Sequence, residues 1–212
     1  MVGPMRAAFI FLVLLLLIGM AVPVLFATQF WNDGSSVIAR AQMSGALRPP
    51  DAGGRLSTAE QTIAMDQFPG TWRARGTPCR TLSYLWNDIS SPDWSDPGTP
   101  VSQRFATVLQ ASRPGGAVRR HVRRFIVACQ LEQRFDDTQI LRMWLSTANF
   151  GPDAVGLETA AQAIFQKPSR ELNAEESARL AALLRAPGLR SQPERWTQRA
   201  QAIQERIAPR MQ

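Results

Sequence analysis

The feature that most constrains this chain is an apolar segment, residues 7–27, which contains no charged side chain. A helix of this length spans about 30 Å, which is the thickness of the hydrocarbon core of a bilayer. Arg6 is the only charged residue before the segment, so the positive-inside rule predicts that residues 1–6 stay in the cytoplasm and that the remainder is exported. A cleaved signal peptide is the alternative, but Leu25-Phe26-Ala27 is a poor cleavage site. We therefore predict one uncleaved transmembrane anchor.

The composition predicts a folded domain with an anionic partner. The 212 residues are 45% hydrophobic and 19% charged, which is too apolar for a disordered chain and too charged for a protein with many membrane spans. Lysine and arginine number 24 against 17 aspartates and glutamates, which gives a net charge of +7, and Lys167 is the only lysine. A basic surface attracts nucleic acid, phospholipid or a diphosphate. The predicted export argues against nucleic acid.

Few residues suit a metal or a cofactor. The single histidine, His121, excludes a metal site made of histidines alone, and two cysteines are too few for a disulfide scaffold. In an oxidising periplasm, Cys79 and Cys129 have the option of pairing with each other. The sequence predicts no cofactor, and it leaves open whether a divalent cation binds.

The exported part divides into a linker and one domain. Residues 28–56 are rich in Gly, Pro, Ser and Asp, which predicts a linker before a domain over residues 57–212. The domain begins with a capping box, Ser57 with Glu60, which predicts a helix that ends by Pro69-Gly70. Residues 70–100 contain several prolines and glycines and receive no assignment.

From Val101 onward the apolar residues recur at helical spacing and predict a mainly α domain. Two further helix starts carry caps, Asp136 with Gln139 and Asn173 with Glu176. The apolar stripes are Val118, Val122, Phe125, Ile126 and Cys129 on one helix; Ile140, Leu141, Trp144 and Leu145 on the next; Leu157, Ala160, Ala161, Ile164 and Phe165 on a third; and Trp196, Ala200, Ile203 and Ile207 on the last.

The C-terminal half carries motifs whose spacing holds without a gap. They are Ile140-Leu141-Arg142-Met143-Trp144-Leu145-Ser146 before Phe150-Gly151, Gly156-Leu157-Glu158-Thr159-Ala160-Ala161 before Phe165-Gln166-Lys167, and the helix 172–181 before Ala186-Pro187. Upstream, Arg120 matches the start of another motif, and Ala128, Leu131 and Glu132 match its end. Together these residues resemble the peptidoglycan glycosyltransferase domain of glycosyltransferase family 51, which occurs in monofunctional transglycosylases and class A penicillin-binding proteins.

The resemblance implies a lysozyme-like, multi-helix fold and a polymerisation reaction. Family members join the 4-hydroxyl of one lipid II molecule to the anomeric carbon of the growing glycan, and a lipid diphosphate leaves. This reaction implies a carboxylate base, cations for the diphosphate, and a groove at the membrane surface for the lipid. The substrate-binding candidates in this chain are Ser102, Gln103, Arg120, Arg124 and Lys167.

The N-terminal half departs from the family pattern at the positions that matter for catalysis. Of the motif Gly-x-Ser-Thr-Ile-Thr-Gln-Gln-Leu, the chain retains Ser102 and Gln103 in kind. Met65 stands where the family has its first glutamate. The second glutamate falls on Arg124 when counted back from Ile140, and on Arg123 when counted forward from Gln103. Loss of a general base typically slows a reaction by about 10²–10⁴-fold.

Asp66 is the weak candidate for a replacement base. It neighbours Met65, but its side chain is shorter than that of glutamate and is displaced by one residue. An active enzyme would otherwise need an unrecognised carboxylate, for which Asp88, Asp93 and Asp96 are candidates.

Arginines and the single lysine are the candidate ligands for phosphate. Arg119 with Arg123, and Arg120 with Arg124, are i,i+4 pairs that repel by about 0.2–0.5 kcal/mol each unless an anion compensates. One interpretation is that they bind a diphosphate or anionic headgroups, because guanidinium binds phosphate through two hydrogen bonds. The other is a solvated face, or ion pairs with Glu132, Asp136 and Asp137. Lys167 either binds phosphate or caps the C-terminus of a helix.

We therefore predict a membrane-anchored, peptidoglycan glycosyltransferase-like protein of the bacterial inner membrane, with its C-terminal domain in the periplasm. Its predicted role is to bind lipid II, a glycan strand or a partner enzyme through a degenerate catalytic site. The alternatives are an active, divergent monofunctional transglycosylase and a structural protein that docks on cell-wall synthesis proteins. Degeneracy requires that no carboxylate lie beside Ser102 and Gln103.

Overall fold

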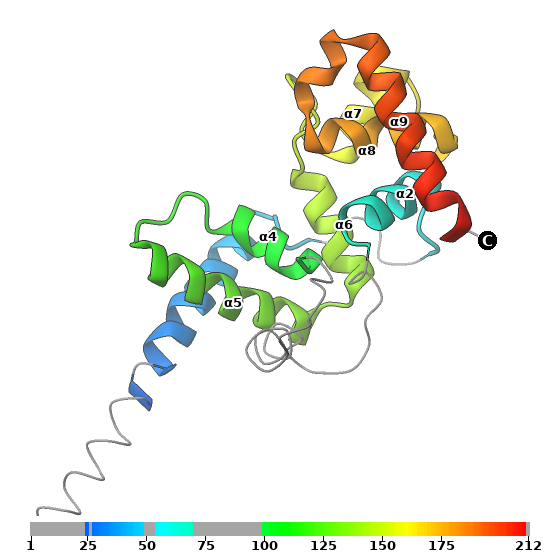
Figure 1. Ribbon diagram of the computed structural model, residues 1–212. Helices are drawn as coiled ribbons and strands as arrows, with labels where there is room; N and C mark the ends of the chain where they lie inside the picture. Colours follow the sequence, from blue (N-terminus) through cyan, green and yellow to red (C-terminus); the bar gives the residue numbers. More distant parts are fainter. Residues whose placement is uncertain (1–23, 26, 49–53, 70–98, 211–212) are drawn as a thin grey trace, which may run out of the picture.

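The computed structural model describes residues 24–25, 27–48, 54–69 and 99–210, and this part of the chain is mainly helical (Figure 1). Its α-helices are α2 (Thr58–Gln67), α4 (Val101–Leu109), α5 (Ala117–Arg134), α6 (Asp137–Thr147), α7 (Leu157–Phe165), α8 (Ala174–Arg185) and α9 (Pro193–Ile207). Short 3₁₀ turns cover Ser169–Glu171, Pro187–Ser191 and Ala208–Arg210. Among these described residues the β-structure is a single bridge between Asn149 and Val155. The prediction of a mainly α fold is confirmed.

The helices form two groups with α6 between them (Figure 1). On one side, α4 packs on α5, and a helical segment at residues 27–43 lies along α5. On the other side, α8 packs on both α2 and α9. Because α6 contacts α4 and α5 as well as α2 and α7, it joins the two groups into one core.

Helix starts follow the predicted caps. Capping boxes form at Ser57 with Glu60, at Asp136 with Gln139 and at Asn173 with Glu176. Each cap satisfies backbone N–H groups that have no partner inside the helix, and such a cap stabilises a fold by about 1 kcal/mol. These local contacts fix where α2, α6 and α8 begin.

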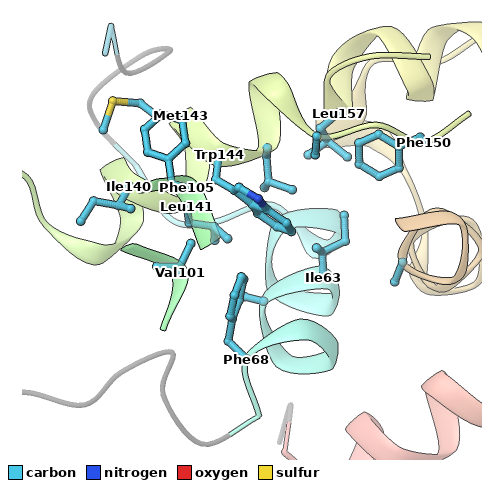
Figure 2. Packing of buried hydrophobic residues seen from close by; sticks show 14 of the residues in the cluster. Ile63, Phe68, Val101, Phe105, Ile140, Leu141, Met143, Trp144, Phe150 and Leu157 are labelled. Carbon is cyan, nitrogen blue, oxygen red and sulfur yellow. The ribbon is translucent and has the colours of Figure 1, made fainter. Parts of the chain in front are cut away.

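The core centres on the aromatic side chains between α2, α4 and α6 (Figure 2). Phe68 meets Trp144 edge to face, with 5.2 Å between ring centroids and an interplanar angle of 74°. Phe105 and Ile63 are fully buried in the same cluster. The predicted place of Trp144 in the core is therefore confirmed.

The prediction of a linker over residues 28–56 is wrong for residues 28–43, which are helical. Val37, Ile38 and Ala41 are buried in the core, so this helix belongs to the folded domain. Gly34, which contributed to the linker prediction, instead allows close packing, because a Cβ atom at this position would lie 2.6 Å from Cγ2 of Ile126. The glycine is therefore explained by close packing on α5 and not by chain flexibility.

The predicted anchor over residues 7–27 lies outside the described residues except at positions 24, 25 and 27. In the part of the chain that the structure describes, no helix is both long and apolar enough to cross a bilayer. The segment 70–98, with Cys79, Asp88, Asp93 and Asp96, also lies outside the described residues.

We predict that Gly34→Leu destabilises the protein by about 1–3 kcal/mol, because the added side chain overlaps Ile126 in a packed contact. Denaturant unfolding of the detergent-solubilised chain measures the change in free energy. The matched control is Ala39→Leu on the exposed side of the same helical segment, which should leave stability within about 0.5 kcal/mol of wild type. Equal stability of the two variants would show that the segment does not pack on α5.

Candidate functional site

Ser102 and Gln103 lie on the first turn of α4, where both side chains are buried. The Ser102 hydroxyl donates a hydrogen bond of 2.5 Å to the Glu132 carboxylate, which belongs to the last turn of α5 and is half-buried. The expectation that no carboxylate lies beside Ser102 is therefore wrong. The physical reason is the packing of α4 on α5, which brings the start of one helix to the end of the other.

Asp66 lies in α2 with a carboxylate that is 0% exposed. Arg206 of α9 donates to one carboxylate oxygen, and Nε of Arg185 in α8 lies 3.4 Å from the other. The Gln67 amide donates to the same carboxylate at 2.6 Å, and Nη2 of Arg185 donates to the backbone carbonyl of Asp66 at 3.0 Å. The buried carboxylate therefore joins α2, α8 and α9, and it presents no exposed oxygen to a substrate hydroxyl. Met65 packs against the core beside it.

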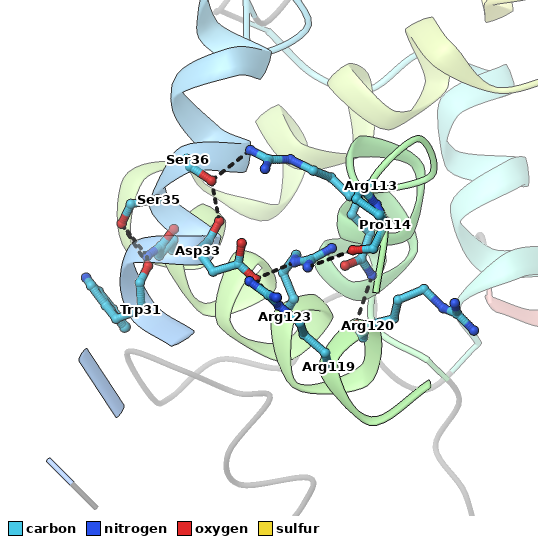
Figure 3. Close-up of polar contacts among 11 residues, drawn as sticks. Trp31, Asp33, Ser35, Ser36, Arg113, Pro114, Arg119, Arg120 and Arg123 are labelled. Atoms are coloured by element: carbon cyan, nitrogen blue, oxygen red, sulfur yellow. Dashed lines mark hydrogen bonds and ion pairs between the residues drawn. The ribbon is translucent and has the colours of Figure 1, made fainter. Parts of the chain in front are cut away.

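Arg123 is 1% exposed, and an arginine is rarely buried to this extent unless its charge is paired (Figure 3). Its Nε donates to Oδ2 of Asp33 at 2.7 Å, and its Nη2 donates to the Pro114 carbonyl at 3.2 Å. Arg119, whose side chain is half exposed, donates from Nε to the same Asp33 oxygen at 3.2 Å. The predicted alternative of ion pairs for these arginines holds, but the acid is Asp33 rather than Glu132, Asp136 or Asp137.

Further hydrogen bonds fasten the helical segment 27–43 to α5 and its preceding loop (Figure 3). The Gln130 amide donates to the Trp31 carbonyl at 3.2 Å and to the Ser35 hydroxyl at 2.9 Å. Arg113 donates to the Ser36 hydroxyl at 2.8 Å. The segment is thus held at several points beside the Asp33 ion pair.

Burial alone would raise the pKa of Asp33, but the hydrogen bonds from Arg123 and Arg119 outweigh it and hold this pKa below its ordinary value. A carboxyl group whose pKa is lower in the folded than in the unfolded protein stabilises the fold above the unfolded pKa. That stabilisation is lost as the pH falls through the lowered, folded pKa. The Asp33 contact should therefore weaken in acid, below the ordinary value near 3.8.

Arg120 and Arg124 differ from their neighbours in having no carboxylate partner among the described residues. Arg120 donates to the Gly115 carbonyl at 2.6 Å and is exposed. Arg124 lies 5.5 Å from the Phe125 ring centroid, and its Nη2 is 3.0 Å from Nδ1 of His121. These two guanidinium groups keep their charge uncompensated on α5, which suits an anionic ligand.

Lys167 is engaged with a carboxylate. Its Nζ donates to Oε1 of Glu176 at 2.6 Å, and Glu176 also completes the capping box of α8. The hydrogen bond from Lys167, helped by that of the Asn173 backbone, holds the pKa of Glu176 below its ordinary value. Lys167 therefore ties the end of α7 to the start of α8, and it would have to leave Glu176 in order to bind phosphate.

Cys129 is disulfide-bonded, and Cys79 is the only other cysteine of the sequence. The sequence left the disulfide open, and the structure shows Cys129 bonded, while Cys79 lies outside the described residues. Within the described ranges, no group of three His, Cys, Asp or Glu side chains is arranged to hold a metal ion.

Spacing along the sequence did not reveal two carboxylates of this site, Glu132 and Asp33. Glu132 ends the motif that also contains Arg120, and this match is the sequence signal that points to it, but the match does not indicate a contact with Ser102. Asp33 lay in the presumed linker, 90 residues from Arg123, and nothing local connects the two.

The sequence is similar to a known protein family and to individual penicillin-binding proteins and peptidoglycan transglycosylases. The Transglycosylase family matches residues 77–212. Penicillin-binding protein 1C of Escherichia coli (strain K12) is 31% identical over 143 residues, which cover 66% of this chain and 18% of that protein. The biosynthetic peptidoglycan transglycosylase of Pasteurella multocida (strain Pm70) is 42% identical over 57 residues, or 27% of this chain and 23% of that protein. A protein of the same name from Ralstonia nicotianae is 32% identical over 90 residues, or 42% and 38% of the two chains. The chain spans well under half the length of each relative.

We predict that Asp33→Asn destabilises the protein at neutral pH by about 3 kcal/mol, because Arg123 keeps a buried charge without its carboxylate. In the wild type, stability should fall as the pH drops below about 4, and the variant should lose less over that range. Denaturant unfolding at several pH values measures both effects. Parallel pH profiles for the two proteins would contradict the assignment.

Asp66→Asn should also destabilise the protein, by about 2–3 kcal/mol, because it weakens hydrogen bonds from two charged groups. The matched control for both aspartates is Asp153→Asn, in an exposed turn with positive φ that asparagine also adopts, which should be neutral. An Asp66→Asn protein as stable as this control would show that the buried ion pairs do not hold α2 to α8 and α9.

Proposed function

Because the chain belongs to the transglycosylase family, we propose that it is a membrane-anchored protein of the bacterial cell envelope that binds lipid II or a glycan strand and polymerises it poorly or not at all. The observation that carries this proposal is the state of Asp66. Asp66, the candidate base beside Met65, is sealed from solvent and paired with Arg185 and Arg206. A general base must reach the proton that it removes, and Asp66 does not meet this condition.

The surroundings of α5 support binding of an anionic substrate. Arg120 and Arg124 are charged, and they have no carboxylate partner in the described part of the chain. Guanidinium binds phosphate oxygens through paired hydrogen bonds, so a lipid diphosphate is the ligand that this pair suits. Ser102 and Gln103 lie on α4, the helix packed against α5. Lys167 would bind the diphosphate only after its hydrogen bond to Glu176 is broken.

One contact favours a second candidate function, an active transglycosylase with an unusual base. The Glu132 carboxylate is half-buried rather than sealed, and it accepts a hydrogen bond from Ser102. A carboxylate in this position could accept a proton from a substrate hydroxyl. This contact fails the condition stated above for a degenerate site, so the first proposal rests on the sealed Asp66 alone. We rank the active enzyme second because Glu132 matches the end of its motif, not the position of the missing glutamate, which is occupied by Arg124 or Arg123.

Three observations support a place outside the cytoplasm. The apolar segment 7–27 is long enough to anchor the chain, with the domain following it. The disulfide at Cys129 is typical of an oxidising compartment such as the periplasm. Both relatives named as biosynthetic peptidoglycan transglycosylases act, by that name, on peptidoglycan, which agrees with an envelope location.

A lipid II assay on the detergent-solubilised full chain separates these functions. We expect the wild type to bind lipid II without forming glycan strands. Arg120→Gln and Arg124→Gln should each weaken binding by about 10- to 100-fold, since a hydrogen bond to a charged group contributes roughly 1.5–3 kcal/mol. Arg134→Gln, on the exposed last turn of α5, is the matched control and should bind normally.

Glycan strands made by the wild type would contradict the proposal. If Glu132→Gln then reduced the rate by about 10²–10⁴-fold, the second candidate function would be correct. Absence of both binding and product would instead indicate a structural protein that contacts other cell-wall synthesis proteins.

A further inference from the structure

A groove of about 480 Å³ lies where the helical segment 27–43 meets the start of α5. Its walls are formed by Gln29, Phe30 and Asp33 from the segment and by the first residues of α5 with the glycine before them, 116–119. Phe30, Ala117 and Val118 give the groove apolar walls, while Arg119 and Asp33 add charge. The groove is separate from the contact between Ser102 and Glu132, which lies at the other end of α5.

One wall residue of this groove, and three residues close in sequence to its lining residues Gln29 and Phe30, are exposed and apolar. Val118, in its wall, is 76% exposed, and Leu25 and Val24, one to two turns before Gln29 and Phe30, are 66% and 58% exposed. Trp31, next to Phe30, is 43% exposed. Large apolar side chains on a soluble surface cost free energy, and a cluster of them marks a contact with a partner or a membrane. Tryptophan in particular is enriched where a membrane meets water.

The position of the groove along the chain places it at the bilayer surface. The predicted anchor ends at Ala27, and Phe30 follows three residues later, about 5 Å farther along a helix. The headgroup layer on each side of the hydrocarbon core is roughly 5–8 Å thick. With the predicted anchor in place, the lipid phosphates and the glycerol-linked parts of the acyl chains would lie at the level of the groove.

The charge of the groove is complementary to a phosphate. Asp33 is the only acid among its lining residues, and it is already paired with Arg119 and Arg123. These three residues together keep one positive charge, and the Arg119 side chain is 52% exposed. An anionic headgroup would meet positive charge beside an apolar wall.

We propose that this groove binds one anionic phospholipid of the surrounding bilayer, with its phosphate at Arg119 and an acyl chain against Phe30 and Val118. The proposal rests on the membrane anchoring proposed above, and it adds a lipid site distinct from the diphosphate ligands Arg120 and Arg124. A lipid held between the anchor helix and α5 would fix the height and tilt of the domain over the membrane. The ion pairs of Asp33 keep the two walls of the groove together.

The test is native mass spectrometry of the full chain released from detergent and titrated with phosphatidylglycerol or phosphatidylcholine. The wild type should bind phosphatidylglycerol about fivefold more tightly than phosphatidylcholine, as expected for one arginine near a lipid phosphate. Arg119→Gln should abolish this preference, while Asp33 stays paired with Arg123. Val118→Ser should weaken both lipids several-fold, and Arg134→Gln should change neither.

A photoreactive phosphatidylglycerol in nanodiscs locates the bound lipid. Crosslinks should fall on peptides that contain residues 29–33 and 116–119, and they should diminish in Arg119→Gln. Equal binding of both lipids, or crosslinks on other peptides, would contradict the proposed lipid site in the groove but not the proposed membrane anchoring. If a lipid diphosphate displaced phosphatidylglycerol from the wild type but not from Arg119→Gln, that result would assign the groove to the substrate and contradict the proposed phospholipid site. A chain that enters no bilayer would overturn the anchoring itself, and the groove with it.

Discussion

The buried ion pair between Arg123 and Asp33 is the contact on which this side of the molecule depends. A guanidinium that is 1% exposed needs a carboxylate beside it, because an unpaired buried charge would cost several kcal/mol. Asp33 supplies that carboxylate from the helical segment 27–43. The segment, α5 and α4 therefore form one unit, and this unit carries Ser102, Gln103, Arg120 and Arg124. The candidate site exists because the segment leading from the predicted anchor is part of the fold.

Features of the fold that depend on neighbours in sequence could be predicted. The starts of α2, α6 and α8 follow from capping boxes, in which a side chain meets a backbone N–H three residues away. The burial of Trp144 and Ile203 follows from apolar spacing at the helical period. Both kinds of signal lie within a few residues, so no knowledge of the tertiary structure is needed.

Features that depend on distant contacts could not be predicted. Composition made residues 28–56 resemble a linker because the window mixed a helix with the Pro- and Gly-rich residues that follow it. The need for glycine at position 34 comes from Ile126, whose side chain packs closely against it across the helix interface. The pairing of Ser102 with Glu132 joins residues 30 apart, and that of Asp33 with Arg123 joins residues 90 apart. Such contacts arise from helix packing, and periodicity within one helix does not contain them.

The two positions that compete for the missing second glutamate are not equivalent in this structure. A glutamate at position 123 would place its carboxylate against Asp33 in a closed site, where like charges disfavour ionisation of both groups and the helical segment would lose its partner. The arginine at 123 and the aspartate at 33 therefore require each other. Arg124 is bound only to His121 and the Phe125 ring in the described part of the chain, so its charge is not needed to hold the fold. The arginine at 123 thus stabilises the packing of the helical segment on α5, whereas the arginine at 124 has no such ion pair in the described part of the chain.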